Sequence, residues 1–308
     1  ELDRWILSEL NTLVSQVDSH LDAYDPTNAG RRMQEFIDQL SNWYVRRSRR
    51  RFWRSENDDD KRSGYITLHT CLVTLAKLMA PLAPFVAEEI YQGLVCSVYP
   101  DAPDSVHLAD FPVADPSLVD HPLERVTRLV MRIASMGRGA RSKAGIKVRQ
   151  PLNSMQLLVR SDIEKLSLAP MTAQIIDEIN VKSLDIGVAG GAGDDDFWEW
   201  KVSANLASIG PKYGAVTQLI ANAVANMDPR TIAMSIDVNG WVQVHVPGET
   251  ISPVQLGYED VTVVKTARKS GHVEIQDGPY AVALDTPITP ELAEEGLARE
   301  LVHRIQNL

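Results

Sequence analysis

The first half of the chain repeats apolar residues with the period of an α-helix. From the N-terminus to position 21 they recur at steps of three and four, the pattern of an amphipathic helix with one apolar stripe. The stripe consists of Ile6, Leu10, Leu13, Val14, Val17 and Leu21. Asp25 and Pro26 end this helix, and Thr27 or Asn28 can cap the next one, which the pattern extends to about Arg54.

Three more helices are predicted before residue 150. Three consecutive aspartates at 58–60 favour a helix start, because carboxylates are stabilised at the positive end of the helix dipole. This helix continues to the breaker APLAP at 80–84, and a short helix follows over 86–94. After a connector rich in Pro and Asp (100–122), a fifth helix starts at about Leu123. Five helices with short links predict a helix bundle.

After Pro151 the pattern changes to short strands mixed with helices. Strands are expected over 154–160, 181–188 and 197–204, with hairpins within 238–246 and 261–284. Helices are expected near 175–179, over 215–227 and in the final segment 286–308, whereas GPKYG (210–214) is expected to turn. The predicted fold class is therefore α+β, with a helix bundle in residues 1–150 and a smaller α+β domain in residues 151–308.

Composition agrees with a globular protein of two domains. The chain has 308 residues, of which 44% are hydrophobic and 23% charged, as is typical of soluble proteins. No apolar run approaches the roughly 20 residues that a membrane-spanning helix needs. Cys71 and Cys96 are too few for a disulfide framework or a four-cysteine zinc site, which favours a reducing compartment. Because the sequence starts and stops inside helical patterns, we expect a piece of a longer polypeptide.

Charge is distributed unevenly along the chain. The formal net charge is −10, yet residues 1–150 contain 20 basic and 20 acidic side chains, and residues 151–308 contain 11 and 21. Within the neutral half, the window 125–149 holds eight basic side chains and no acidic one. Since the local field decides whether a polyanion binds, the acidic total does not exclude a nucleic-acid partner.

An arginine-rich segment, WYVRRSRRRFW at 43–53, lies within the second predicted helix. At 100° per residue, Arg51 projects near the centre of the apolar side of this helix, and Arg47 projects at its margin. An unpaired charge facing the core would cost several kcal/mol. Both arginines are therefore expected to pair with carboxylates, for which Glu88 and Glu89 are candidates.

The opposite arc of the same helix carries Arg46, Arg49, Arg50 and Trp53, and no carboxylate on the helix compensates them. Three guanidinium groups beside an indole suit pairing with phosphates and stacking on bases. Nucleic-acid binding is the sharper hypothesis for this arc, and an ordinary solvated face is the alternative.

A second basic segment follows in 125–149. Its basic residues are Arg125, Arg128, Arg132, Arg138, Arg141, Lys143, Lys147 and Arg149. Eight uncompensated charges would repel one another in a free protein, and a polyphosphate partner would relieve that repulsion by releasing counterions. RNA binding is therefore expected here as well. The alternative is that these side chains pair with the carboxylates of the second half.

Motifs for catalysis or metal binding are absent from the sequence. There is no phosphate loop, no nucleophile elbow and no zinc-spaced Cys/His set, so no catalytic residue and no metal ligand is predicted. Lys212, within GPKYG, would contact an anion together with backbone N–H groups if this segment opened a helix. A capped turn is the plainer alternative.

Four motifs in the first half resemble the anticodon-binding bundle of class I aminoacyl-tRNA synthetases. They are DRWILSELNTLV, LSNWYVRRSRRRFW, LMAPLAPFVAEEIY and SVHLADFP. Three later motifs, ARSKAGIKVRQPL, IGPKYG and ITPELAEEGLARELVHRIQNL, are similar to the C-terminal region of isoleucyl-tRNA synthetases. The resemblance covers nearly the whole chain and is strongest to the isoleucyl-tRNA synthetase family, whereas the arginine segment alone is shared with valyl and leucyl relatives.

The resemblance implies the tRNA-binding part of a cytoplasmic ligase that joins isoleucine to its tRNA with ATP and Mg²⁺. The catalytic and editing domains would lie upstream in the same chain, so this part would need no cofactor, no zinc and no membrane, and would not aminoacylate by itself. The expected partner is the anticodon arm of an isoleucine-accepting tRNA, with Trp53 stacking on a loop base. The alternative is a structural docking module of a valyl- or leucyl-type synthetase without direct RNA contact.

Overall fold

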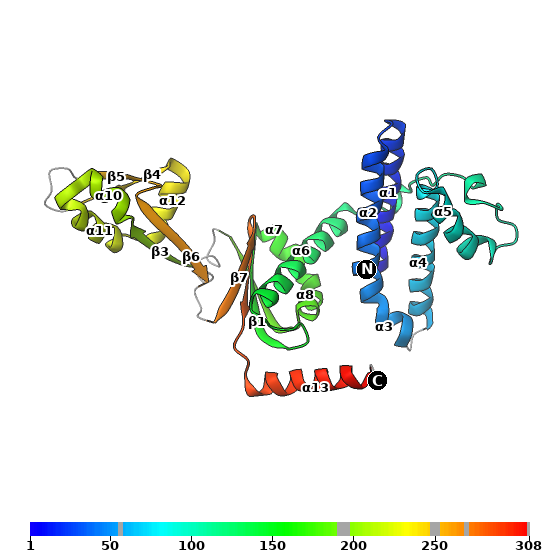
Figure 1. Cartoon of the computed structure of the whole chain (residues 1–308). Coiled ribbons are helices and arrows are strands. Elements are labelled where there is room, and N and C mark those ends of the chain that lie inside the picture. The colour runs from blue at the N-terminus through cyan, green and yellow to red at the C-terminus, as the bar shows by residue number, and fades with distance from the viewer. Residues whose placement is uncertain (55–57, 190–197, 247–252, 268–270, 307–308) are drawn as a thin grey trace. The chain divides into compact units, whose positions relative to one another are not determined.

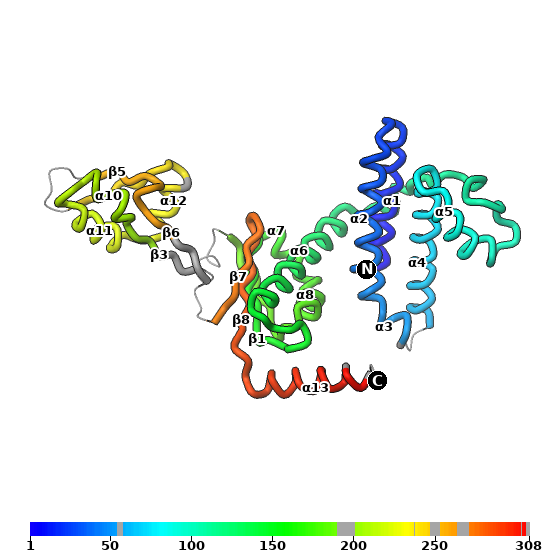
Figure 2. The backbone as a smooth tube through the Cα atoms, in the orientation of Figure 1, coloured from blue at the N-terminus to red at the C-terminus, as the bar shows by residue number. Residues whose placement is uncertain are grey.

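The structure is a computed structural model that describes residues 1–54, 58–189, 198–246, 253–267 and 271–306. Figures 1 and 2 show the order of the elements from blue at the N-terminus to red at the C-terminus. The chain divides into two compact units, Glu1–Met131 and Arg132–Leu308. The division falls inside helix α6 (His121–Lys143), which contributes to both units.

The first unit is built from helices. They are α1 (Leu2–Asp22), α2 (Pro26–Gln39), α3 (Arg46–Arg54), α4 (Asp58–Met79), α5 (Pro84–Tyr91) and the first part of α6. A π-helical segment, η1 (Leu40–Val45), joins α2 to α3, and a second one, η2 (Gln92–Cys96), extends α5. Two short 3-10 turns, η3 (Val106–Leu108) and η4 (Pro116–Leu118), lie in the connector before α6.

The core of the bundle follows the apolar stripe of α1, which packs against α2 and α4. Its buried apolar side chains on α1 are Trp5, Ile6, Leu10, Leu13, Val14 and Val17. The stripe predicted from the period of the sequence is confirmed, except that Leu21 in the last turn is only half-buried.

The start of α2 corrects the predicted cap. The side chain of Asp25 accepts a hydrogen bond from the backbone N–H of Asn28 at 3.0 Å, and Pro26 occupies the first helical position. Asp25 is therefore the N-cap, and not Thr27 or Asn28. A proline at the first position has no N–H to satisfy and already has a helical φ, so it starts the helix here.

The second unit contains a four-stranded sheet in the order β2-β1-β8-β7. Its strands are β1 (Leu152–Val159), β2 (Val181–Val188), β7 (His272–Asp277) and β8 (Tyr280–Asp285). β1 and β2 are parallel, with Leu157 opposite Ile186, and helices α7 (Asp162–Leu168) and α8 (Thr172–Ile179) connect them. β8 pairs antiparallel with both β1 and β7. A parallel pair needs such a helical crossover, which the sequence indicated near residues 175–179.

A separate apolar core lies between residues 198 and 267 of the same unit. Two antiparallel pairs form it, β3 (Trp198–Ala204) with β6 (Val261–Ala267) and β4 (Trp241–Val244) with β5 (Val254–Gly257). Three helices are connected to them, α10 (Leu206–Tyr213), α11 (Thr217–Asn226) and α12 (Pro229–Asn239). Its central buried side chains are Ile209, Ile220, Val224, Ile232, Val244 and Leu256. The last helix of the unit is α13 (Pro290–Gln306).

The predicted α+β fold class is confirmed, with helices first and sheets afterwards. Two local predictions are wrong: GPKYG lies mostly within α10 instead of forming a turn, and Val238 and Asn239 end a helix instead of starting a hairpin. Gly240 closes that helix in the left-handed region, at φ 79°. The predicted domain boundary after residue 150 stays a prediction.

Candidate nucleic-acid interface

The π-helical segment η1 sets the rotation of α3. The buried side chains along this stretch are Leu40, Trp43, Tyr44, Ser48 and Phe52, and four of them, Leu40, Tyr44, Ser48 and Phe52, follow one another at steps of four. A straight α-helix continuing from Leu40 would bring positions 47 and 51 to the same side. The π turn accommodates one extra residue, so the buried side moves on by about one position. The sequence projection placed Arg51 at the centre of the side that faces the core. In the structure, Ser48 and Phe52 occupy that position.

Two polar atoms next to this turn are buried without a partner. Trp43 Nε1 and Ser48 Oγ have no hydrogen-bond partner in the part of the chain that the structure describes. Trp43 also holds two guanidinium groups over its ring, those of Arg46 and Arg47, each 5.5 Å from the ring centroid. The indole of Trp43 is therefore buried and at the same time makes cation–π contacts with two arginines of the segment.

Arg51 on α3 forms ion pairs inside the bundle. Its guanidinium donates to both carboxylate oxygens of Asp3 at 2.7 and 2.6 Å, and its Nε donates to Asp60 at 2.9 Å. The prediction that Arg51 is partly buried and ion-paired is confirmed, but its partners are not Glu88 or Glu89. Glu88 instead accepts hydrogen bonds within its own end of the bundle, from the connector before α6 and from η2.

Tyr44 completes this network, because its hydroxyl donates to Asp3 at 2.6 Å. Burial alone would raise the pKa of Asp3, but the hydrogen bonds from Arg51 and Tyr44 outweigh it and hold that pKa below its ordinary value. Burial, followed by the hydrogen bond to Asp3, raises the pKa of Tyr44. The inner side of α3 is thus neutralised by α1 and α4.

The outer side of α3 carries the four residues that the sequence singled out. Arg46, Arg49, Arg50 and Trp53 are all exposed, and the indole of Trp53 is 77% accessible. Arg46 donates from Nε to the carbonyl of Asn42 at 2.9 Å, which fixes its stem along the helix. Neither Arg49 nor Arg50 has an ion-pair partner among the residues that the structure describes.

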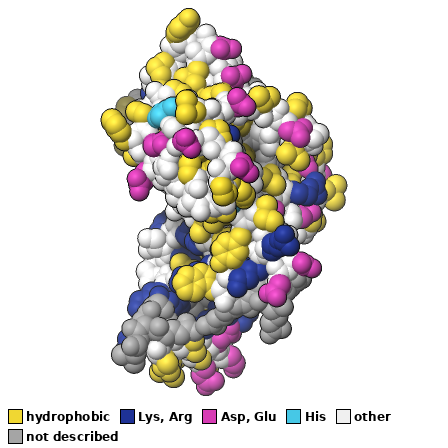
Figure 3. Space-filling model, turned by 90° about the vertical axis from the view of Figure 1, so that its right-hand side faces the viewer, with side chains coloured by type: hydrophobic (Ala, Val, Ile, Leu, Met, Phe, Trp, Pro, Cys, Tyr) yellow, Lys and Arg dark blue, Asp and Glu magenta, His cyan; other side chains and the backbone are white. Residues whose placement is uncertain are grey.

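A surface of this kind combines positive charge with an apolar ring. On the face shown in Figure 3, Lys and Arg side chains likewise lie beside large hydrophobic side chains in the lower half of the view. Exposed guanidinium groups pair with phosphate oxygens, and an exposed indole offers a flat surface for a base. The outer side of α3 therefore presents the side-chain types that phosphates and bases contact.

The basic residues of segment 125–149 were expected to be uncompensated, but several of them have partners within the fold. In the first unit, Arg128 donates to both oxygens of Glu9 at 3.0 and 2.6 Å, and the Glu9 side chain is only 2% exposed. Burial would raise the pKa of Glu124, but hydrogen bonds from Ser8 and Thr12 outweigh it and hold that pKa low. These contacts attach α6 to α1, so Arg128 is a packing residue.

In the second unit, Arg132 and Arg138 are also paired. Arg132 donates from Nε to Asp277 at 2.6 Å and lies over the ring of Tyr280, and Arg138 is 3.4 Å from the buried carboxylate of Glu178. The partners come from β7 and α8 of the sheet. The expectation that the basic residues of this segment are uncompensated is therefore wrong for these two, and the alternative of internal pairing is correct for them.

Arg141 is buried completely, with 1% of its surface exposed. Its guanidinium donates to four backbone carbonyls, those of Ile179, Asn180, Lys147 and Gln150, at 2.7–3.0 Å. Burial lowers the pKa of Arg141 to about 10, so it remains charged at neutral pH. A side chain enclosed in this way cannot reach RNA, and its role is to join the end of α6 to the sheet.

The remaining basic residues of the segment lie at the surface. Lys143 donates to the carbonyl of Glu274 at 3.2 Å. The Arg149 guanidinium and, more weakly, Lys147 hold the pKa of Glu300 below its ordinary value. Arg125 is exposed and has no ion-pair partner within the described ranges. Of the eight predicted RNA-binding residues here, Arg125 and Lys147 are exposed and have no side-chain hydrogen bond or ion pair among the described residues.

Lys212 does not form the anion site considered from the sequence. Its ammonium group donates to Glu259 at 2.9 Å and to Asp260 at 2.7 Å, which raises its pKa. It also lies in the last turn of α10, where backbone carbonyls and not N–H groups point outward. Both features repel an anion, so the prediction is wrong.

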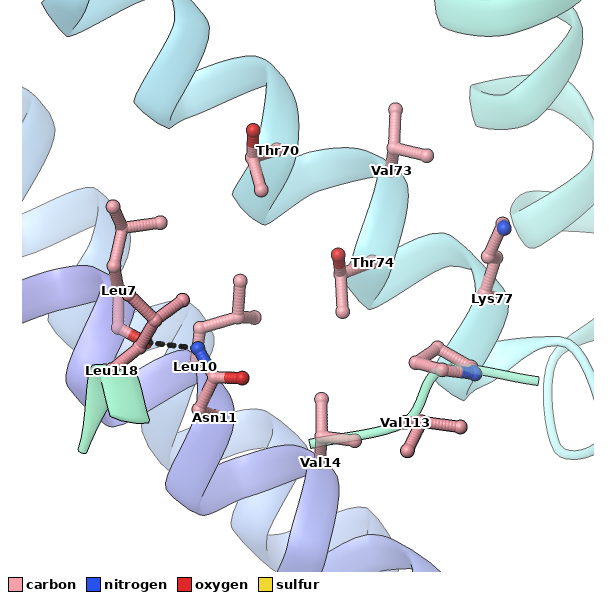
Figure 4. A pocket seen from close by; sticks show the side chains of 11 residues that line it. Leu7, Leu10, Asn11, Val14, Thr70, Val73, Thr74, Lys77, Val113 and Leu118 are labelled. Atoms are coloured by element: carbon pink, nitrogen blue, oxygen red, sulfur yellow. Dashed lines mark hydrogen bonds between the residues drawn. The ribbon is translucent and has the colours of Figure 1, made fainter. Parts of the chain in front are cut away.

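A cavity of about 280 Å³ lies in the first unit between α1, α4 and the connector (Figure 4). Its walls are mainly aliphatic, with Leu10 and Val14 from α1 and Val73 from α4. Asn11 donates to the carbonyl of Leu7 at 2.8 Å and accepts from the backbone N–H of Asp115. The lining contains no nucleophile paired with a base, so it offers no catalytic arrangement among these residues.

The described residues contain neither a metal-binding cluster nor a membrane-spanning helix. No group of three or more His, Cys, Asp or Glu side chains among them is placed to hold a metal ion. None of the helices in the described ranges is both long and apolar enough to cross a membrane.

Comparison with known proteins decides which family has this bundle. The anticodon-binding domain of tRNA ligases matches residues 3–156, half of the chain. The chain belongs to this family. The match includes the whole of α3 with its exposed arginines, and it confirms the resemblance that the sequence motifs indicated.

Individual relatives extend the similarity over the second unit. The chain is 44% identical over 308 residues to the isoleucine–tRNA ligase of Dehalococcoides mccartyi. It is 40% identical to those of Bacteroides thetaiotaomicron, over 313 residues, and Thermobifida fusca, over 307 residues. These alignments cover 100, 100 and 99% of this chain but 23, 26 and 28% of the relatives. The chain thus spans about a quarter of the length of the curated relatives it matches.

Proposed function

We propose that this chain is the tRNA-binding part of an isoleucine–tRNA ligase and that it holds the anticodon arm of an isoleucine-accepting tRNA. The observation that carries the proposal is the outer side of α3, where Arg46, Arg49, Arg50 and Trp53 are exposed within the matched anticodon-binding domain. These cations stand out because the chain as a whole has a formal net charge of −10.

The contacts proposed for this surface have different chemical roles. The guanidinium groups of Arg49 and Arg50 pair with phosphates of the stem, which positions the RNA without reading its sequence. Trp53 stacks on a base of the single-stranded loop, where bases are free to unstack. Arg125 and Lys147 are proposed as additional phosphate contacts, whereas Arg128, Arg132 and Arg138 mainly stabilise the fold through their carboxylate partners.

The proposed whole enzyme activates isoleucine with ATP and Mg²⁺ in the cytoplasm and transfers it to tRNA. We assign these steps to a catalytic domain upstream in the longer polypeptide, which the length of the relatives makes room for. The part described by the structure takes no catalytic role in this proposal. It contributes affinity and orientation of the tRNA.

The proposal is tested by titrating the chain with an isoleucine tRNA transcript at several salt concentrations. Because each phosphate contact releases a counterion, the affinity is expected to fall steeply as salt rises. The double variant Arg49→Glu/Arg50→Glu is expected to reduce the affinity by at least about 30-fold, since it replaces two attractions with two repulsions. Its helical melting curve is expected to stay the same, because both side chains are exposed.

The matched control is Arg31→Glu/Arg160→Glu. It makes the same change in net charge at two exposed arginines outside the proposed surface, one on α2 and one at the end of β1. Its affinity is expected to stay within about threefold of the parent chain, because only long-range attraction changes. Equal losses in both variants, or equal binding of the tRNA and heparin, would refute a specific surface on α3.

A second candidate function is a structural module that docks against other domains without touching RNA. The internal pairing of Arg128, Arg132 and Arg138 favours it, because those arginines need no external partner. The relatives named isoleucine–tRNA ligase do not favour the valyl or leucyl form of this alternative. Absence of tRNA binding by the chain with its fold intact would support the docking role.

A further inference from the structure

Helix α4 packs against α3 and carries a half-exposed tyrosine at their contact (Figure 1). Before α3 begins, Tyr44 donates to the carbonyl of Gly64 on α4 at 3.2 Å. Further along α3, Arg51 donates to Asp60, which precedes Gly64, at 2.9 Å. The two helices therefore run antiparallel. Tyr65 follows Gly64 directly, and 50% of its surface is accessible.

The ring of Tyr65 is held by the ring of Phe52 on α3. The two ring centroids are 4.9 Å apart and the planes are inclined by 34°, so one face of the tyrosine ring lies on Phe52. Phe52 itself is buried. The accessible half of Tyr65 therefore includes the other face of its ring, and its hydroxyl has no hydrogen-bond partner among the described residues.

Phe52 separates two edges of α3. Arg51 precedes it and Trp53 follows it, so each is rotated by about 100° from Phe52, in opposite directions. The edge of Arg51 is closed by its ion pair with Asp60 of α4. The edge of Trp53 also contains Arg49, which is rotated by about 60° from Phe52 in the same direction as Trp53. This second edge is open, because Arg49 and Trp53 are both exposed.

Tyr65 lies at the open edge. Gly64 faces α3, because a Cβ there would be 3.0 Å from the ring of Phe52. Asp60 and Tyr65 are rotated from Gly64 in opposite directions, by about 40° and 100°. Since Asp60 is at the closed edge, Tyr65 lies at the other one, together with Trp53. The two helices thus present two exposed aromatic side chains on one edge, with the buried ring of Phe52 between them.

Charge differs between the two sides of this open edge. α3 contributes arginines without acidic neighbours on the helix, whereas the first turns of α4 contain the aspartates at 58–60 and only two cations, at 61 and 62. A phosphate is therefore favoured over α3 and disfavoured over α4. A neutral flat ring suits the position of Tyr65 better, and an unpaired RNA base is such a ring.

We propose that Tyr65 is a second base-stacking residue, which holds an unpaired nucleotide of the anticodon loop next to the nucleotide on Trp53. This proposal rests on the proposed function of the α3 surface and extends that surface onto α4. Both rings lie within the residues matched by the anticodon-binding family, 3–156. Every base has a π face, so stacking on two neighbouring rings binds loop nucleotides with little regard to their sequence.

The proposal is tested with two RNA probes, an anticodon stem-loop of an isoleucine tRNA and a duplex of the same stem without the loop. Tyr65→Ala is expected to reduce the affinity of the 308-residue chain for the stem-loop by at least about fivefold, because one base loses its stacking partner. The affinity for the duplex should stay within about twofold, and the salt dependence should not change, because no phosphate contact is lost.

The matched control is Tyr99→Ala in the same unit. Tyr99 is 52% exposed and also contacts one other ring, that of His69, with 6.1 Å between the centroids. This variant should bind both RNAs like the parent chain.

Two further variants separate stacking from packing at position 65. Tyr65→Phe keeps the aromatic face and should bind the stem-loop within about twofold of the parent chain. Tyr65→Leu keeps an apolar cover on Phe52 but has no aromatic face, so it should lose affinity for the stem-loop while its helical melting curve stays close to that of the parent chain.

Three results would overturn the role of Tyr65. The first is equal loss of affinity in Tyr65→Ala and Tyr99→Ala. The second is equal loss for the stem-loop and the duplex. The third is unchanged affinity for the stem-loop in both Tyr65→Ala and Tyr65→Leu, since the ring would then serve only to cover Phe52.

The same probes distinguish failure of this proposal from failure of the proposed function. If Arg49→Glu/Arg50→Glu lowers the affinity for both RNAs while Tyr65→Ala lowers neither, only the role of Tyr65 is wrong. If neither variant lowers the affinity for either RNA, the surface on α3 is wrong as well, and the proposal for Tyr65 fails with it.

Discussion

Helices α3 and α6 are both rich in arginine, but the fold pairs most of the arginines of α6 and leaves some of those on α3 exposed. On α6, carboxylates bind Arg128, Arg132 and Arg138, and backbone carbonyls enclose Arg141. On α3, carboxylates bind Arg51 on the inner side, while Arg49 and Arg50 point away from the bundle. The density of arginine along a sequence therefore does not indicate an open cationic surface. Whether the arginines of a helix stay exposed and unpaired depends on the hydrogen-bond acceptors that neighbouring elements offer.

The difference has a simple physical origin. A guanidinium group that faces another element must find acceptors there, because a buried charge without them is too costly. α6 has neighbours along most of its length, in α1 and in the sheet, and each of them supplies acceptors. Arg49 and Arg50 on the outer side of α3 have no ion-pair partner among the described residues, so their charges remain available to a partner.

The largest effect is expected for Arg141→Leu. This change removes four hydrogen bonds to backbone carbonyls. The carbonyls of Asn180 and Lys147 keep a backbone N–H donor, whereas those of Ile179 and Gln150 lose the donor that Arg141 supplies, and a buried acceptor left without a donor costs about 1–3 kcal/mol. The free energy of unfolding of the second unit should fall by at least about 3 kcal/mol, measured by urea denaturation with circular dichroism. Lys182→Ala, which removes an exposed ion pair of the same unit, should cost about 1 kcal/mol or less. If the two variants lost similar amounts of unfolding free energy, Arg141 would not hold α6 to the sheet.

A smaller effect is expected for Asp3→Asn, which weakens the inner contacts of Arg51. The loss of a charged hydrogen bond should lower the free energy of unfolding by about 1–3 kcal/mol at neutral pH. The folded-state pKa of Asp3 lies below its ordinary value of 3.8, so the unfolded chain binds the proton first as the pH falls. The stabilisation is present above about pH 4 and is lost as the pH falls through the folded-state pKa.

The pH dependence provides the check on this second prediction. The difference in unfolding free energy between the parent chain and Asp3→Asn should shrink in acid, whereas the exposed control Asp18→Asn should differ little from the parent at any pH. A difference that stays constant into acid would mean that ionisation of Asp3 does not contribute to the bundle.

The smallest effect is expected for Arg132→Gln. Both side chains of its ion pair with Asp277 are exposed, so the free energy of unfolding should change by about 1 kcal/mol or less. The affinity for tRNA should stay within about twofold of the parent chain. Arg50→Gln on α3 should reduce tRNA affinity by roughly three- to tenfold and lower its dependence on salt, because a phosphate contact is lost. Equal losses of affinity in the two variants would remove the distinction between α3 and α6.

Much of the fold was predictable because it rests on local patterns. The period of the α1 stripe gave the bundle, and the change of pattern after Pro151 gave the α+β class. Arg51 was expected to be partly buried and ion-paired, but its partner Asp3 lies 48 residues away in the sequence, and spacing alone does not indicate such a pairing. The π turn left no recognisable pattern either, since one extra residue in a helix changes no local propensity.

The open arginines and the buried one could not be told apart from the sequence. Arg141 binds backbone carbonyls, and every residue has one, so no residue type marks its partners. Lys212 was misjudged because the motif GPKYG resembles a turn before a helix, while the packing of Ile209 in the core makes it the end of one. In both cases the outcome depends on tertiary contacts.

The π-helical segment has a consequence for the way this protein can diverge among species. The segment lies between α2 and α3 and sets how far α3 is rotated about its axis relative to α2. Gain or loss of a single residue within 40–45 would therefore turn α3 by about 100° about its axis. The packing of α2 would stay as it is, while a different set of side chains would face outward. One codon in this short stretch thus controls which surface the arginine helix offers.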